Sequence, residues 1–252
     1  LIAWWISREI VPPAPDLSEV QLAFLGSTAR KTWHFFETFV NARENWLPPD
    51  NFQETPAPVV ASRTSPTNMG LALLANLAAR DFGYITLGGL VERTDNTLGT
   101  MLGLERYRGH FFNWYETRTL NPLPPRYVST VDSGNLAGHL LTLASGLREA
   151  EDGMIFSPQV FAGMRGTLDV LKESAGDDAA LAELDAALKD APATLTESFA
   201  LLERVTAMAA RIAESLPGAG EEAVKWAQIL ERTCGERRVE LLAFVSWLGQ
   251  PE

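Results

Sequence analysis

Two long proline-rich segments, residues 45–68 and 107–131, interrupt a sequence whose pattern is otherwise largely helical. Loops of this length inside a compact chain are uncommon and usually functional. Each of these segments joins an amphipathic helical segment to a helical segment that is apolar nearly all round. Residues 81–84 (DFGY) form a tight turn between the first of these helix pairs and the second. Because successive connections between antiparallel helices fall on opposite ends, the two long loops are predicted to share one face, where function is expected.

The periodicity of apolar residues predicts two kinds of helix in this first part of the chain. Outer helices, apolar on one side, are expected over about 17–43 and 86–106, and inner helices, apolar all round, over about 68–79 and 133–148. Inner helices walled by outer ones predict an all-α fold, a partial α/α toroid. Capping residues are predicted at the helix starts: Asp16 or Ser18, Ser65 with Pro66, Thr86, and Asp132 or Ser133. Two short strands, 110–116 and 126–131, are predicted to pair across the turn at 121–125.

From residue 149 alanine and acidic residues dominate, and four helices are predicted at about 158–173, 178–190, 193–215 and 221–248. This part holds 19 acidic and 9 basic side chains, and so carries most of the net charge of −11. We interpret it as an acidic helical bundle inserted after the toroid hairpins. The chain is expected to divide into three parts. Residues 1–15 are the end of a preceding membrane segment with its linker, or alternatively a short docking segment. Residues 16–148 are the hairpins, and residues 149–252 are the bundle.

Several function classes are disfavoured by composition. No basic patch is visible, so nucleic acid is not an expected partner. The three histidines, at 34, 110 and 139, are far apart, so no metal site is predicted, and no cofactor is expected either. The single cysteine, Cys234, has no matched histidine nearby and is interpreted as structural.

The two long loops mix aromatic rings with planar hydrogen-bonding groups, a combination that suits a sugar-like ligand. A rigid structural loop is the alternative. Glycoside chemistry needs two carboxylates at a defined separation, and Asp50 and Asp132 could face one cleft. Each also has a structural interpretation, since Asp132 can cap its helix and Asp50 can hold a turn.

The runs NWLPPDNFQETPAPVVASRTSPTN and AARDFGYITLGGLVERTDNTLGTMLGLERYRGHFFNWYETRTLNPLPPRYVSTVDSGNLAGHL resemble cyclic β-1,2-glucan synthases, over about residues 28–148. The resemblance implies the start of a glycoamylase-like α/α-toroid domain, set between a membrane-embedded glycosyltransferase and a phosphorylase-like domain of the same polypeptide. It implies polymerisation of glucose from UDP-glucose at the bacterial inner membrane, on its cytoplasmic side. The middle domain would cyclise a linear β-1,2-glucan by retaining transglycosylation through two glutamates.

Those glutamates are expected beyond this chain, so no catalytic residue is assigned. Candidate glucan contacts follow from the matching motifs: Asn45, Trp46, Asp50, Asn51, Arg63, Asn113, Trp114, Tyr115, Tyr127, Ser129 and Asp132. Two other functions stay open. The chain could be a non-catalytic helical spacer or interaction module, or a free-standing α/α-toroid glycosidase acting through Asp50 and Asp132.

Overall fold

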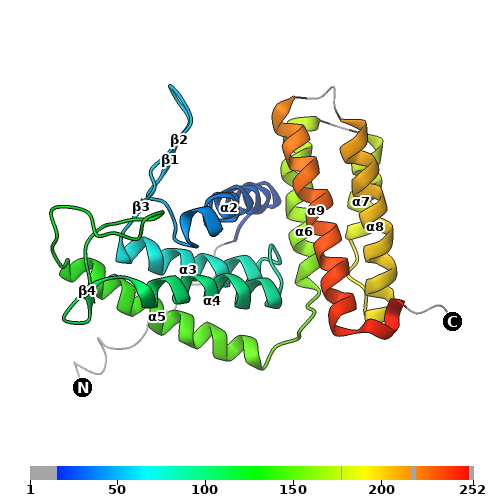
Figure 1. The fold of residues 1–252 in the computed structure, drawn as a ribbon. Coiled ribbons are helices and arrows are strands. Elements are labelled where there is room, and N and C mark those ends of the chain that lie inside the picture. The colour runs from blue at the N-terminus through cyan, green and yellow to red at the C-terminus, as the bar shows by residue number, and fades with distance from the viewer. Residues whose placement is uncertain (1–15, 177, 217–219, 250–252) are drawn as a thin grey trace, which may run out of the picture.

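The computed structural model describes residues 16–176, 178–216 and 220–249; the opening segment predicted at 1–15 lies outside them. The described chain is mostly helical, in two groups (Figure 1). The first group holds α2 (Glu19–Phe39), α3 (Pro66–Asp81), α4 (Leu87–Gly103) and α5 (Thr130–Glu151). The second holds α6 (Gln159–Ala175), α7 (Ala179–Leu188), α8 (Leu195–Ser215) and α9 (Glu221–Phe244). The predicted all-α fold class is confirmed, with a helical bundle following the hairpins.

Side-chain caps start the helices of the first group. Ser18 and Gln21 form a capping box at α2, and Ser65 caps α3 with Pro66 in its first turn. Thr86 caps α4 as predicted. The start of α5 differs from the prediction, because the cap is Ser129, whose hydroxyl accepts a hydrogen bond from the backbone N–H of Asp132 at 3.1 Å. Asp132 therefore lies inside the first turn and its carboxylate is free to contact other groups.

The two predicted inner helices, α3 and α5, pack against each other, and α3 also packs against α4, as in a partial α/α toroid. Their common core comprises Leu47, Met69, Leu73, Met101, Leu104, Tyr115, Leu136 and Leu143. Helix α3 is largely buried, except at positions such as Leu71, which is 47% exposed. Helix α5 is not, because Leu141 is 75% exposed and Val131 70% exposed. The expectation that α5 is enclosed was therefore wrong on this face, over which the described residues place no other helix.

Short strands occur only in the loops of the described chain. Strand β1 (Phe52–Gln53) pairs with β2 (Val59–Val60) in a hairpin that projects from the helices (Figure 1). Strand β4 (Arg106–Tyr107) pairs with β5 (His110–Phe111), and β3 (Arg63–Thr64) with β6 (Tyr115–Glu116). Since β3 and β6 belong to different long loops, their pairing confirms that both loops lie on one face.

The predicted pairing of 110–116 with 126–131 was wrong. The two segments share one backbone hydrogen bond, from the N–H of Asn113 to the carbonyl of Tyr127 at 2.8 Å. The strand partner of β6 is β3, and β6 meets the segment that follows it at an isolated bridge between Tyr115 and Pro122.

The second group is a four-helix bundle in which α9 packs against both α6 and α8, and α7 packs against α6 and α8. Its core is separate from that of the hairpins and includes Phe161, Leu168, Leu202, Val205 and Trp226. A short 3-10 helix, η2 (Ser246–Gly249), follows α9, and another, η1 (Ala42–Glu44), follows α2. No helix among residues 16–176, 178–216 and 220–249 combines the length and hydropathy required to cross a bilayer.

The two groups meet where α2 packs against α6 and where the turn after α3 contacts α6. Gly83 in this turn has φ +73°, and a Cβ built on Gly163 would lie 2.1 Å from its carbonyl oxygen. The backbones of the turn and of α6 are thus in direct contact. Glycine is required at both positions, at Gly163 for the close approach and at Gly83 also for its left-handed conformation.

We expect Gly163→Ala to lower the free energy of unfolding by about 1–3 kcal/mol, because the added methyl group forces the turn away from α6. Gly166→Ala, on the same helix, is the matched control. Its Cβ would meet the Tyr84 ring at an ordinary 3.5 Å, and alanine favours the helix by up to about 1 kcal/mol. Urea unfolding of both variants provides the measurement; equal stabilities would contradict the close contact.

Candidate functional site

The pairing of β3 with β6 brings the two long loops together, with Arg63 opposite Glu116 and Thr64 opposite Tyr115. A buried carboxylate reinforces the junction. Glu44 is 3% exposed, and it accepts hydrogen bonds from the hydroxyls of Ser62 and Thr117 and from Arg118, whose Nε lies 3.0 Å away. These contacts link η1, the short 3-10 helix after α2, to both loops, so the loop face is held by more than the short ladder.

Two of the predicted contact residues support this junction. The side-chain amide of Asn45 donates to the backbone carbonyls of Thr117 at 2.8 Å and Arg118 at 3.1 Å. Tyr115 is fully buried, and its hydroxyl donates to the carbonyl of Glu105 and accepts from the N–H of Phe112, both at 2.7 Å. The polar groups of the Asn45 and Tyr115 side chains are therefore already hydrogen-bonded to the protein backbone.

Six other predicted residues form one continuous set of contacts, which we name the loop-face cluster: Asp50, Arg63, Asn113, Trp114, Tyr127 and Asp132. At one end the Arg63 guanidinium donates to Asp50 Oδ2 from both Nη2, at 2.9 Å, and Nε, at 3.2 Å. The same guanidinium carbon lies 5.1 Å from the centroid of the Trp114 ring. Asp50 thereby positions a cation against an aromatic face.

Asn113 joins the other end of the loop-face cluster. With its amide oriented to satisfy its neighbours, it donates to Asp132 Oδ2 at 3.0 Å and accepts from Trp114 Nε1 at 2.6 Å and from the Tyr127 hydroxyl at 2.8 Å. Asn113 is 6% exposed, whereas Tyr127 is 49% exposed. A buried amide therefore fixes the orientation of two rings that reach the surface.

The sequence analysis missed three polar residues beside this cluster. The Thr67 hydroxyl donates to Asp132 Oδ1 at 2.6 Å, and Asn135 donates to Thr67 at 3.1 Å. Asn68 donates to Asp50 Oδ1 at 3.5 Å. Thr67 and Asn68 lie in the first turn of α3, directly after the cap at Ser65, and their place beside the loops was the available signal.

The remaining predicted contacts are less central. Asn51 is exposed, and its amide donates to Asp50 Oδ2 at 3.2 Å. Ser129 caps α5. Trp46 leaves the loop face: its ring centroid lies 5.9 Å from the Arg93 guanidinium, and the residue lines a different cavity.

That cavity, which we name the α2–α9 cleft, has a volume of about 1360 Å³. It is bounded by α2, the start of α4 and α9, and by Phe52 and Glu54 of the projecting hairpin. Side chains from both helical groups therefore line it.

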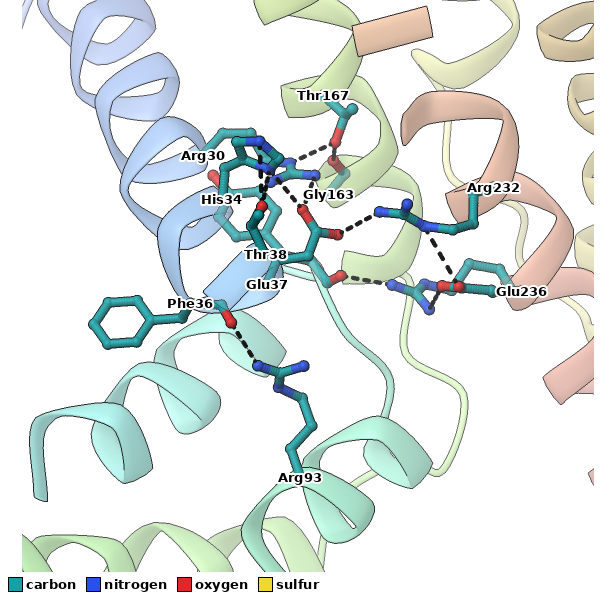
Figure 2. Close-up of polar contacts among 12 residues, drawn as sticks. Arg30, His34, Phe36, Glu37, Thr38, Arg93, Gly163, Thr167, Arg232 and Glu236 are labelled. Carbon is teal, nitrogen blue, oxygen red and sulfur yellow. Dashed lines mark hydrogen bonds and ion pairs between the residues drawn. The ribbon is translucent and has the colours of Figure 1, made fainter. Parts of the chain in front are cut away.

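An ionic network joins α2 to the bundle on the lining of this cleft, with Glu37 of α2 at its centre (Figure 2). Glu37 accepts from Arg30 and from His34 through Oε2, and from Arg232 of α9 through Oε1, at 3.2 Å in each case. Arg30 also donates to the Thr167 hydroxyl of α6 at 2.8 Å. The network thus connects α2 to two helices of the bundle.

Opposing effects set the pKa of Glu37. Burial acts to raise it, but the hydrogen bond to His34 and the charges of Arg30 and Arg232 outweigh burial and lower the pKa to about 2. A carboxylate this strongly held in its charged form stabilises the folded state.

Few other groups in the described chain suggest chemistry. Burial raises the pKa of the Cys234 thiol to about 12, in agreement with a structural role. Among the residues with described positions, no group of three or more His, Cys, Asp and Glu is arranged to hold a metal ion.

We expect Glu37→Gln to lower the free energy of unfolding at pH 7 by on the order of 3 kcal/mol, the value that corresponds to lowering the pKa from 4.5 to about 2. The wild-type contribution is fully present above pH 4.5 and is lost as the pH falls towards 2. The variant should therefore lose less stability than wild type across this range. Chemical unfolding at several pH values measures this, with the exposed Glu54→Gln as control; identical pH dependence in all three proteins would contradict it.

No protein-family model matches the chain. The cyclic β-(1,2)-glucan synthase NdvB of Rhizobium meliloti (strain 1021) is 46% identical over 181 residues, which cover 71% of this chain and 6% of the relative. The chain thus spans a small part of that protein. A solved structure of a putative glucoamylase from Bacteroides fragilis is 18% identical to this chain. The match covers 71% of this chain and 36% of that structure, and its TM-score of 0.35 is too low to bear on the fold. The sequence match confirms the predicted relationship: over most of its length, this chain is similar to a segment of a cyclic β-(1,2)-glucan synthase.

Proposed function

We propose that the chain is part of a cyclic β-1,2-glucan synthase and that its loop-face cluster binds the glucan. The observation that carries the proposal is the buried Asn113 amide, which orients the Trp114 and Tyr127 rings at the surface. Aromatic faces pack against the apolar faces of sugar rings, while Arg63 and the amides beside them can exchange hydrogen bonds with hydroxyl groups. The 46% identity to a β-(1,2)-glucan synthase supports this choice of sugar.

In this proposal the cluster positions the glucan, and the reacting carboxylates of a retaining transglycosylation lie elsewhere in the parent protein. The contacts of the two candidate aspartates favour this division. Asp50 is occupied by Arg63 and Asn68, and Asp132 by Thr67 and Asn113. Each carboxylate therefore already has a positioning role, which makes a free-standing glycosidase acting through the pair the weaker proposal.

The expected partners are the glycosyltransferase and phosphorylase-like domains of the same polypeptide, at the cytoplasmic side of the bacterial inner membrane. A spacer role for the bundle is the second candidate. The observation that favours it is that α6 and α9 hold α2 through Thr167 and Arg232. Deleting 152–249 from the parent enzyme should then impair assembly; unchanged cyclisation and assembly would exclude this role.

We expect Tyr127→Ala and Trp114→Ala to weaken binding of linear β-1,2-glucan by roughly tenfold each, as is common when a central aromatic contact is removed. Calorimetric titration of the folded 252-residue chain provides the measurement. Tyr107→Ala is a matched control, because Tyr107 lies in the same loop and is similarly exposed, 53% against 49%, but lies outside the cluster. Unchanged affinity in both cluster variants, with wild-type thermal stability, would reject the site.

A further inference from the structure

We infer that the α2–α9 cleft is a second oligosaccharide site, which takes a neutral glucan chain independently of the loop-face cluster. The choice of ligand rests on the proposed function, but the site is separate. Its volume of about 1360 Å³ exceeds the roughly 300–1,000 Å³ typical of pockets for single small molecules. The cleft therefore has room for several linked sugar units.

Charge in the cleft is balanced, which favours a ligand without net charge. Five basic and five acidic side chains line it: Lys31, Arg93, Lys225, Arg232 and Arg237, with Glu37, Glu54, Glu92, Glu236 and Glu240. Several of the cations are already engaged. Lys31 pairs with Glu173 at 2.6 Å, Arg232 pairs with Glu37, and Arg93 donates to the carbonyl of Phe36 at 2.8 Å. A phosphate group would find no surplus of positive charge, whereas hydroxyl groups can both donate to and accept from these side chains.

One wall of the cleft is aromatic. The rings of Phe39 and Phe52 lie 4.8 Å apart between centroids, and Trp46 lines the same cavity beside Arg93. All three side chains are only partly buried. The wall thus offers ring faces to a ligand and combines apolar and polar surface, as sugar-binding requires.

Two buried donors on the lining lack partners within the described chain. Trp33 and Arg237 are each 4% exposed, and neither the indole N–H of Trp33 nor Nε of Arg237 has a hydrogen-bond acceptor there. Unsatisfied buried donors are rare and call for an explanation. Both nitrogen atoms are closed to solvent, so a ligand in the cleft accepts from them only after the lining side chains shift.

The test combines calorimetry with hydrogen exchange on the 252-residue chain, using linear β-1,2-glucan oligosaccharides, UDP and inorganic phosphate as separate probes. We expect the oligosaccharides to slow exchange in 225–240 of α9 as well as in 113–132. Phe52→Ala and Trp46→Ala should weaken the cleft site by roughly tenfold and remove protection of α9, while protection of 113–132 persists. Trp247→Ala, an exposed tryptophan in η2, which follows α9, should change neither.

The outcomes separate the two sites. Protection of 113–132 without any change in α9 would overturn the second site and leave the proposed function standing. Protection of α9 alone would reject the loop-face cluster and support the cleft. Protection of α9 by UDP or phosphate but not by oligosaccharide would make the cleft an anion site and overturn the inference, and protection of neither region would reject both sites.

Discussion

The loop face depends on the short antiparallel pairing of β3 with β6, which joins loops that are far apart in sequence. Two residues on each strand would be a weak link alone. The buried Glu44 carboxylate secures it through Ser62, Thr117 and Arg118, because each hydrogen bond to a buried charge would be costly to lose. With the junction fixed, Asn113 orients the rings of the loop-face cluster without help from a ligand, so the proposed glucan binding would carry a lower ordering cost.

A second set of constraints joins the hairpins to the bundle. Glu37 compensates the buried charge of Arg30, and the Gly83–Gly163 contact allows the turn after α3 to touch α6 directly. Arg237 of α9 completes the joint by donating to the carbonyl of Tyr84 at 2.6 Å. The α2–α9 cleft lies beside this joint, so its shape depends on charged and glycine contacts rather than on one continuous apolar core.

Local patterns were enough to predict the helices, because capping residues and 3.6-residue periodicity are short-range signals. Ser65 with Pro66 and Thr86 marked the starts of α3 and α4 correctly. The strand partner of β6 was not predictable in this way, since β3 belongs to the other long loop, far away in the sequence, and short-range signals do not report such a pairing. Topology correctly placed the two loops together, but it could not separate Trp46, which lies on the cleft side, from Trp114 on the loop face. That distinction depends on the path of the chain through Asn45 and Trp46, which both have positive φ.

The burial of Cys234 has a practical consequence. It is the only cysteine in the chain, and its thiol lies 3.5 Å from the sulfur of Met164 inside the bundle core. Burial raises the pKa of this thiol to about 12, so it stays protonated at pH 7, whereas the thiolate is the reactive form. A cysteine introduced on the surface would therefore react selectively with spectroscopic labels, and the native residue could remain in place.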